Sequence, residues 1–319
     1  MDMAMRRYTL IKACLALIGT GLAIVPAAAN PAGIIVTVPK SHQIDFRSVT
    51  TGRDYRLMVA MPEAPPPPAG YPVVYVIDGG LYFATAVETM RLQARNFIKP
   101  AIIVGIGYPS DDTTSALTRR NRDLTLPLTA SDLKAPVFRM GGLTDPAETG
   151  GLDAYLAMLL QEVRPMIGRL APIDLSQQVL LGHSLGGLAV LRQFLRDPQS
   201  YSGYVSSSPS IWFKDRAVLA DEADLPRRLA ALASAPALLL TVGSTEDDAP
   251  KLPAGYPMGQ DAANAESRKM GMVSNLVALG KRLADVPRLR VQTVVFDGED
   301  HAGVVPAAIS RGLRVMLRR

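Results

Sequence analysis

The chain has 319 residues, of which 48% are hydrophobic and 20% are charged. This balance suits a well-filled core and excludes a disordered or low-complexity protein. Lys and Arg total 34 against 29 Asp and Glu, which gives a net charge of +5. Because no block of the chain is rich in lysine or arginine, the charge gives no reason to expect nucleic acid as a partner.

The first 29 residues have the pattern of a secretion signal. Basic side chains near the start precede an uncharged apolar run of 13 residues, 13–25. A proline then leads to Ala27-Ala28-Ala29, the small residues that signal peptidase accepts before Asn30. The apolar run is too short for a membrane span, which takes about 20 residues. We therefore expect a periplasmic or secreted protein with no stable membrane insertion after cleavage.

The pair Arg6-Arg7 also fits a twin-arginine signal, so that export route stays open. The only cysteine, Cys14, lies within the expected signal. The mature chain, residues 30–319, would then have no thiol nucleophile, no cysteine metal site and no disulfide, and it suits an oxidising compartment.

The mature chain opens with segments of strand character. Residues 43–49 and 55–61 alternate apolar and polar side chains around Thr51-Gly52-Arg53-Asp54, which predicts an antiparallel hairpin. Two continuous apolar runs follow, at 71–77 and 101–106, and such runs are typical of strands buried on both faces of a parallel sheet. Helical composition separates these two runs, at residues 83–96.

Helices and strands then alternate to the end of the chain. The expected helices are residues 152–170, 185–195, 225–233, 262–284 and 305–317. The expected strands are residues 178–181, 204–206, 237–242 and 289–296, the last of them alternating and therefore placed near the sheet edge. The pattern predicts a single α/β domain over residues 30–319, with a mostly parallel central sheet and helices on both faces. Residues 111–151 are polar and short of periodicity, so we expect them to decorate the domain near a binding face.

The motif Gly182-His183-Ser184-Leu185-Gly186-Gly187 directly follows an expected strand and opens an expected helix. This is the G-x-S-x-G nucleophile elbow in its strand–turn–helix context. The turn is so tight that it needs glycines, and it lifts the Ser184 hydroxyl above the sheet. It also places the Leu185 N–H at a helix N-terminus, where it can donate to a developing oxyanion. Ser184 is therefore the candidate nucleophile.

A serine hydroxyl needs a base near neutral pH, and the chain offers three histidines. His183 adjoins the nucleophile, and we expect its side chain to point away from the reaction. His42 precedes the first hairpin. His301 follows the last expected strand, where the order Ser, acid, His used by α/β-hydrolases places the base.

The acid that orients the base is expected after the strand at 237–242, where Glu246, Asp247 and Asp248 are consecutive. Glu246 stands three residues after the glycine that ends this strand, where its side chain can turn back over the sheet edge. We favour Glu246, and Asp247 and Asp248 remain open. At least two of the three form an exposed acidic turn. Asp215 is the next candidate if none of them serves.

A second oxyanion donor is expected in the loop after residues 71–77, which reads Asp78-Gly79-Gly80-Leu81. Its glycines let backbone N–H groups approach a substrate closely, with Gly80 or its neighbour Leu81 as the donor. The alternative is a plain strand-to-helix turn.

Taken in order, these motifs resemble the putative-esterase group of α/β-hydrolases, which contains siderophore trilactone (enterobactin-type) esterases and esterase D-like enzymes. The motifs that carry the resemblance are Ile77-Asp78-Gly79, Gly182-His183-Ser184-Leu185-Gly186-Gly187, Ser208-Pro209-Ser210-Ile211-Trp212, Gly243 with Glu246, and the late His301. The resemblance covers almost all of the mature chain. It implies the fold, serine ester hydrolysis with no cofactor and no metal, and Ser184 and His301 as nucleophile and base.

The leading hypothesis is an exported serine carboxylic-ester hydrolase that acts through an acyl-enzyme on a small-molecule ester, and siderophore esters are attractive substrates for it. Arg119, Arg120 and Arg122 would attract anionic ligands, and Trp212 is a further candidate for substrate binding. A solvated basic patch is the alternative for the arginines. Acyl transfer to an alcohol or amine and general small-ester hydrolysis are the other enzymatic hypotheses. A non-catalytic binding module would normally have lost the serine or the histidine. The sequence does not indicate an oligomeric state.

Overall fold

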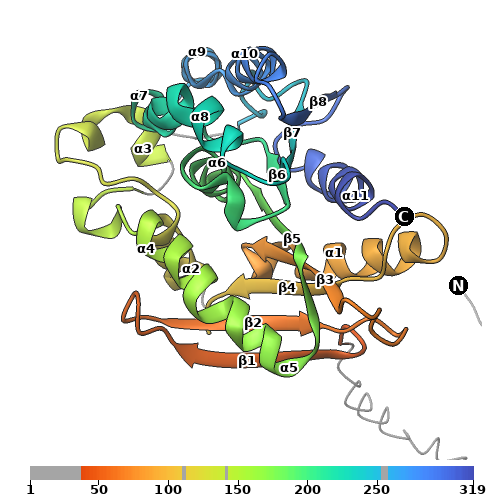
Figure 1. Cartoon of the computed structure of the whole chain (residues 1–319). Helices are drawn as coiled ribbons and strands as arrows, with labels where there is room; N and C mark the ends of the chain where they lie inside the picture. Colours follow the sequence, from red (N-terminus) through yellow and green to blue (C-terminus); the bar gives the residue numbers. More distant parts are fainter. Residues whose placement is uncertain (1–36, 110–112, 141–142, 253–257) are drawn as a thin grey trace, which may run out of the picture. The chain divides into compact units, whose positions relative to one another are not determined.

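The computed structural model describes residues 37–109, 113–140, 143–252 and 258–319 (Figure 1). The expected signal peptide, residues 1–29, lies outside the described residues. Residues 38–319 form one unit. Within the described ranges, no helix is both long and apolar enough to cross a membrane.

Eight strands of the described residues form one sheet, in the order β1-β2-β4-β3-β5-β6-β7-β8. Their bounds are β1 Ser41–Arg47, β2 Asp54–Ala60, β3 Tyr71–Ile77, β4 Ile102–Gly107, β5 Ile173–His183, β6 Gly203–Ser207, β7 Ala237–Gly243 and β8 Arg290–Phe296. The pairs β1–β2 and β2–β4 are antiparallel, and all the other neighbours are parallel. The predicted fold class is confirmed: the sheet is mostly parallel and opens with an antiparallel hairpin.

The burial of the strands follows their apolar patterns. Every residue of β3 and of β4 is buried, as expected of continuous apolar strands inside a parallel sheet. The alternating strand β8 forms one edge of the sheet and β1 forms the other, so the predicted edge position of the last strand is confirmed. Because β3, β5, β6, β7 and β8 are parallel, their carboxyl ends lie along the same side of the sheet. The loops that carry the candidate site residues begin there.

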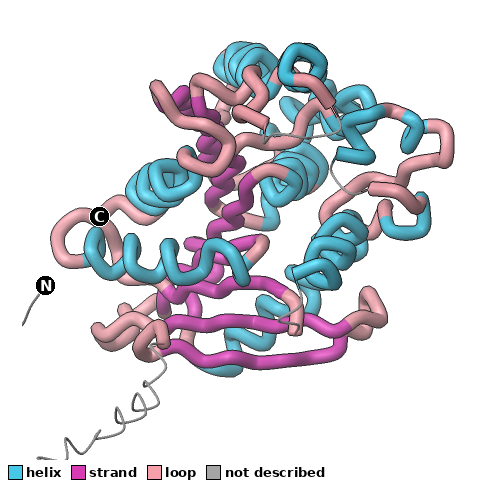
Figure 2. Tube along the Cα trace, turned by 180° about the vertical axis from the view of Figure 1, so that it is seen from behind, coloured by secondary structure: helices cyan, strands magenta, loops and turns pink. Residues whose placement is uncertain are grey.

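Helices cover both faces of the sheet, as the view from behind also shows (Figure 2). Their bounds are α1 Gly79–Ala94, α2 Thr113–Asp123, α3 Pro136–Met140, α4 Leu152–Met158, α5 Arg164–Leu170, α6 Leu185–Arg196, α7 Phe213–Arg216, α8 Leu225–Ala230, α9 Gln260–Met270, α10 Met272–Ala284 and α11 Val304–Met316. Helices α1 and α11 bury apolar side chains on one face. Helices α4, α6 and α10 contribute to the core on the opposite face.

Several expected helices differ from those in the structure. The helix expected over residues 152–170 is α4 and α5 with a π-helical turn, Leu159–Val163, between them. The helix expected over residues 262–284 is two helices, α9 and α10, because Gly271 takes the left-handed conformation (φ 55°) that ends one and begins the next. Helix α1 begins at Gly79, four residues before the expected start, so Gly80 lies in its first turn. Its first turn contains Gly79 and Gly80, and glycine has a low helix propensity, so the residue types did not indicate a helix start there.

The described part of the segment 111–151 contains more regular structure than its polarity predicts. It contains α2 and α3, and it contributes buried apolar side chains to the core, among them Leu124, Leu126 and Phe138. These side chains are spaced irregularly because short helices and turns separate them, which is why no periodicity is visible in the sequence.

Candidate active site

Ser184 lies on a strained turn between β5 and α6. Its φ and ψ are 61° and −119°, a conformation that a non-glycine residue rarely adopts. A Cβ at Gly182 would collide with the carbonyl oxygen of Gly186, and a Cβ at Gly187 would lie 2.5 Å from that of Ser207. The tight approach of backbones therefore requires glycines here, and the turn has the geometry expected of a nucleophile elbow.

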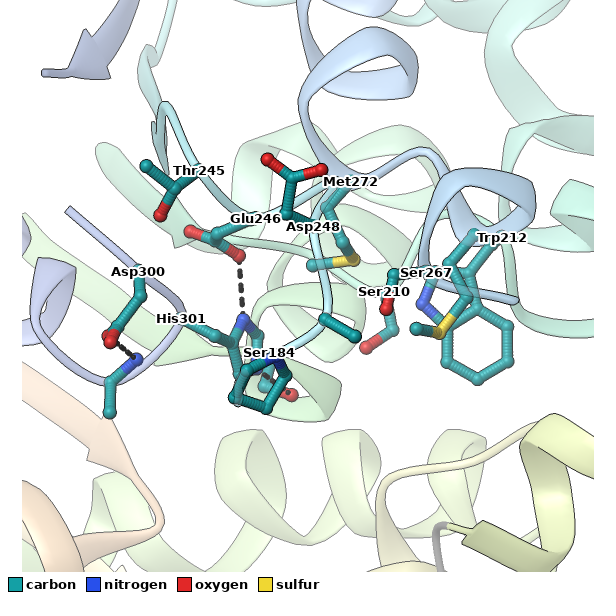
Figure 3. A pocket seen from close by; sticks show the side chains of 14 residues that line it. Ser184, Ser210, Trp212, Thr245, Glu246, Asp248, Ser267, Met272, Asp300 and His301 are labelled. Carbon is teal, nitrogen blue, oxygen red and sulfur yellow. Dashed lines mark hydrogen bonds and ion pairs between the residues drawn. The ribbon is translucent and has the colours of Figure 1, made fainter. Parts of the chain in front are cut away.

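A chain of hydrogen bonds joins three of the predicted site residues (Figure 3). His301 Nε2 lies 3.0 Å from Ser184 Oγ. On the other side of the ring, His301 Nδ1 lies 2.6 Å from Glu246 Oε2. Ser184 follows β5, Glu246 follows β7 and His301 follows β8, so three parallel strands bring the residues together at one edge of the sheet. The arrangement can move a proton from the serine hydroxyl to the imidazole.

Glu246 is the one of the three consecutive carboxylates that the structure places against His301. It is buried, and its Oε1 accepts hydrogen bonds from Ser208 Oγ at 2.6 Å and from the Gly243 N–H at 2.6 Å. Its two neighbours have other contacts. Asp247 Oδ1 accepts from the Val273 N–H at the start of α10, and Asp248 is exposed, 3.8 Å from Arg268. Asp215, the reserve candidate, is also exposed.

The two predicted oxyanion donors occupy the first turns of helices. Leu185 is the first residue of α6, and Gly80 is the second residue of α1. The Leu81 N–H donates to the Asp78 carbonyl oxygen at 2.9 Å, whereas the N–H of Gly80 belongs to the helical turn that has no intrahelical acceptor. The two helix starts lie next to each other. A Cβ added to Gly186, the second residue of α6, would lie 3.3 Å from Oδ2 of Asp78, the residue before α1.

His183 contacts the candidate base, which the sequence reasoning did not anticipate. Its ring is buried, and its centroid lies 4.5 Å from that of His301. Its Nδ1 lies 3.1 Å from Ser207 Oγ. Burial first, and then the charges of His301 and Arg120, lower the pKa of His183 well below its ordinary value. His183 is therefore neutral and supports the His301 ring from the side of the core.

A cavity of about 570 Å³ opens beside Ser184 and His301. Trp212 is among its lining residues, so the structure places one of the three expected substrate contacts there. Neither Arg120 nor Arg122 is among the described residues that line it. Arg120 Nε donates to Asp78 Oδ1 at 2.9 Å in a buried ion pair, and the side chain of Arg122 is exposed.

Several further residues of the site had no role assigned from the sequence, among them Ser208, Met270 and Met272. Ser208 donates to Glu246, and Met270 and Met272 line the cavity. A polar residue directly after a buried parallel strand was the available signal for Ser208. No sequence pattern indicated Met270 and Met272, because their position in the cavity wall depends on the break between α9 and α10. Within the described ranges, no group of three or more His, Cys, Asp and Glu side chains is placed to hold a metal ion.

Comparison with protein families gives a match to the model described as "Putative esterase", over residues 48–270. This range exceeds half of the chain. The chain belongs to this family. Ferri-bacillibactin esterase BesA of Bacillus subtilis (strain 168) is 33% identical over 288 residues, which cover 88% of this chain and 91% of that relative. The siderophore triacetylfusarinine C esterase of Aspergillus fumigatus is 29% identical over 287 residues, covering 87% and 93%.

Solved structures agree with this assignment. The BES protein from Bacillus cereus superposes with a TM-score of 0.74 at 29% identity, covering 91% of this chain and 99% of that chain. The siderophore hydrolase EstA from Aspergillus nidulans gives a TM-score of 0.72 at 26% identity, covering 86% and 93%. These likenesses confirm the α/β-hydrolase fold. Together with the family, they support an ester hydrolase that acts on a small molecule.

Proposed function

We propose that this chain is an exported serine carboxylic-ester hydrolase that acts through an acyl-enzyme. The observation that carries the proposal is the chain of hydrogen bonds from Ser184 through His301 to Glu246, with Ser184 on a strained turn at a helix N-terminus. A hydroxyl, an imidazole and a carboxylate in this order form the arrangement that activates serine for acyl transfer.

In the first half of the reaction, Ser184 Oγ attacks the ester carbonyl carbon and its proton passes to His301 Nε2. The carbonyl oxygen becomes an oxyanion, which the N–H groups of Leu185 and Gly80 stabilise. Glu246 holds His301 in the tautomer that presents Nε2 to the serine and stabilises the imidazolium. The ester C–O bond then breaks, the alcohol leaves with the proton from His301, and the acyl group remains on Ser184.

Water completes the cycle. His301 accepts a proton from water as the water oxygen attacks the acyl carbon, and the proton returns to Ser184 Oγ when the acid is released. An alcohol or amine acceptor in place of water would make the reaction an acyl transfer. Product analysis with and without such acceptors distinguishes the two outcomes.

Siderophore esters are the proposed substrates. Relatives that match most of the chain are named esterases of ferri-bacillibactin and of triacetylfusarinine C, and both are siderophores. The proposed export fits the signal pattern of residues 1–29, and N-terminal sequencing of the protein from the producing cell should find Asn30 first. An intact Met1 on the periplasmic or secreted protein would contradict cleavage.

The central test uses a fluorophosphonate probe and a series of p-nitrophenyl esters of increasing chain length. The wild-type protein should be labelled covalently and should hydrolyse the esters. Ser184→Ala should lose both labelling and turnover, and His301→Ala should lose turnover, while both variants stay folded by circular dichroism. Persistent labelling of Ser184→Ala would show that another serine is the nucleophile.

A further inference from the structure

The C-terminal ends of α1 and α11 lie side by side. The Lys99 N–H donates to the Leu317 carbonyl oxygen at 2.8 Å, and Ile98 pairs with Arg318 in an isolated β-bridge. Arg319 Nε donates to the Ile98 carbonyl oxygen at 3.1 Å, across 221 residues of sequence. Figure 1 shows the end of the chain beside the loop that follows α1. Folding therefore joins two stretches that are far apart in the sequence.

Both stretches are rich in cations and contain no acidic residue. Residues 89–100 contain two arginines and a lysine, and residues 301–319 contain four arginines, with no Asp or Glu in either. Arg314, in the last turn of α11, suits the negative end of the helix dipole. Arg311 precedes that turn and Arg318 follows the helix, so the dipole does not account for them.

The positive charges of these two stretches are not neutralised by carboxylates. Arg91 is the exception, because it pairs with Glu88 at 2.6 Å. Lys99 Nζ donates to Gln177 Oε1, and the other contacts of this kind are also with uncharged groups, so they fix side chains without cancelling charge. Within the described ranges, no ion pair joins a carboxylate to any of the other six cations, Arg95, Lys99, Arg311, Arg314, Arg318 and Arg319.

Two large apolar side chains are exposed among these cations. Leu92 of α1 is 66% exposed and Phe97, in the loop after it, is 56% exposed. The Arg314 guanidinium lies 5.0 Å from the centroid of the Phe97 ring, so the aromatic and the basic groups share one surface. Cations beside exposed aliphatic and aromatic side chains are typical of proteins that bind the surface of an anionic membrane. A soluble polyanion would gain nothing from Leu92 and Phe97.

This surface lies away from the candidate active site. Helix α1 begins directly after β3, and α11 begins three residues after His301, so both helices start on the side of the sheet that carries the site. They contain 16 and 13 residues, which corresponds to about 24 and 20 Å of helix. The loop after α1 enters β4 at its amino end, on the opposite side of the sheet. A membrane bound there leaves the cavity beside Ser184 open to water.

We propose that this surface docks the protein on an anionic phospholipid membrane. We call it the basic surface, and it consists of Arg95, Lys99, Arg311, Arg314, Arg318 and Arg319 together with Leu92 and Phe97. The binding is peripheral and reversible: the cations approach the lipid phosphates, and the two apolar side chains enter the headgroup region. No residue of the basic surface belongs to the candidate active site, so this proposal stands or falls separately from ester hydrolysis.

Sedimentation with lipid vesicles tests the proposal. One set of vesicles is phosphatidylcholine alone, and the other is an equal mixture of phosphatidylcholine and anionic phosphatidylglycerol. At about 0.1 M salt the wild-type protein should bind the mixed vesicles at least roughly tenfold more strongly, and about 1 M salt should weaken this binding because it screens the charges. Equal binding to the two kinds of vesicle would overturn the proposal.

Charge reversal identifies the surface responsible. Arg311→Glu/Arg318→Glu should weaken binding to the mixed vesicles at least roughly tenfold. The matched control is Arg47→Glu/Arg227→Glu, which makes the same change of net charge at arginines that are 69% and 75% exposed on β1 and α8. The control should bind almost as strongly as wild type. Every variant has the same N-terminus, so a difference between the two pairs reports the basic surface, and equal binding by both would refute it.

The apolar side chains distinguish a membrane from a soluble polyanion. Leu92→Ser/Phe97→Ser should weaken binding to the mixed vesicles several-fold and leave binding to dextran sulfate unchanged. Leu92→Ser alone should act in the same direction and serves as the second variant if the double one is less stable by circular dichroism. Vesicle binding that survives both substitutions would make the surface a general polyanion site and overturn the membrane proposal. Hydrolysis of a p-nitrophenyl ester without vesicles should be the same in all these variants.

Discussion

Arg120 Nε donates to Asp78 Oδ1 across 2.9 Å, and this buried ion pair joins the segment 111–151 to the start of α1. Asp78 has a left-handed backbone (φ 58°), and its Oδ2 adjoins the elbow at Gly186. Burial raises the pKa of Asp78, and the Arg120 guanidinium opposes this effect. The pair thus lies directly behind the turn that carries Gly80.

Replacing one partner of this ion pair should lower the free energy of unfolding more than replacing both partners. Arg120→Met or Asp78→Asn leaves one buried charge without its partner and should lower the free energy of unfolding by about 3–5 kcal/mol. The double variant Asp78→Asn/Arg120→Met removes both charges and should regain most of that loss. Urea unfolding of the four proteins measures the effect, and a double variant no more stable than the single ones would refute it. If the pair also positions Gly80, the stable double variant should still show a reduced kcat.

Glu246→Gln should lower kcat roughly a thousandfold or more with little change in KM, because the carboxylate stabilises the imidazolium mainly in the transition state. Asp247→Asn is the matched control, since Asp247 caps α10 and does not face His301. Steady-state kinetics on a p-nitrophenyl ester decide the matter. A wild-type kcat in Glu246→Gln would mean that the serine and histidine work without this acid.

Ser208→Ala should reduce both stability and turnover. The hydroxyl donates to Glu246 Oε1 inside the core, so its loss leaves a buried carboxylate oxygen with one hydrogen bond fewer and should cost about 1–3 kcal/mol of unfolding free energy. Glu246 would also be held less firmly against His301, so kcat should fall. Ser202→Ala removes a hydroxyl that bonds the Gln178 carbonyl oxygen far from the site, and it should not lower kcat. Equal kinetics for the two variants would exclude a role for Ser208 in positioning.

His183 should make the protein less stable in acid. Its pKa in the folded state lies well below the ordinary value of 6.5, so between these two values the unfolded chain binds a proton that the folded chain does not. This contribution to stability is complete above about pH 6.5 and is lost as the pH falls towards the folded pKa. Unfolding of wild type and His183→Asn at several pH values between 8 and 5 is the measurement. The variant should show a smaller loss of stability, and identical profiles would contradict the assignment.

Much of the fold was predictable from local pattern. The continuous apolar runs at β3 and β4, the alternation in β8 and the glycines around Ser184 each report one element's environment, and the structure agrees with them. Such patterns arise because a strand's side chains alternate between faces and because a tight turn leaves no room for a Cβ. Each of these patterns depends only on residues close together in the sequence, so it can be recognised from the sequence alone.

Only the tertiary structure showed which residues that are distant along the chain contact one another. Whether Glu246, Asp247 or Asp248 faces His301 depends on the parallel pairing of β7 with β8 and on the hydroxyl of Ser208, which follows β6. Arg120 looked like a ligand contact because nothing in its own segment reveals that Asp78, 42 residues earlier, is its partner. Contacts between distant segments are set by which strands pair and by the conformation of the loops that follow them, and the periodicity of one segment does not identify its partner. The sequence by itself thus determined the fold class and the candidate nucleophile and base, whereas packing decided which carboxylate faces the base.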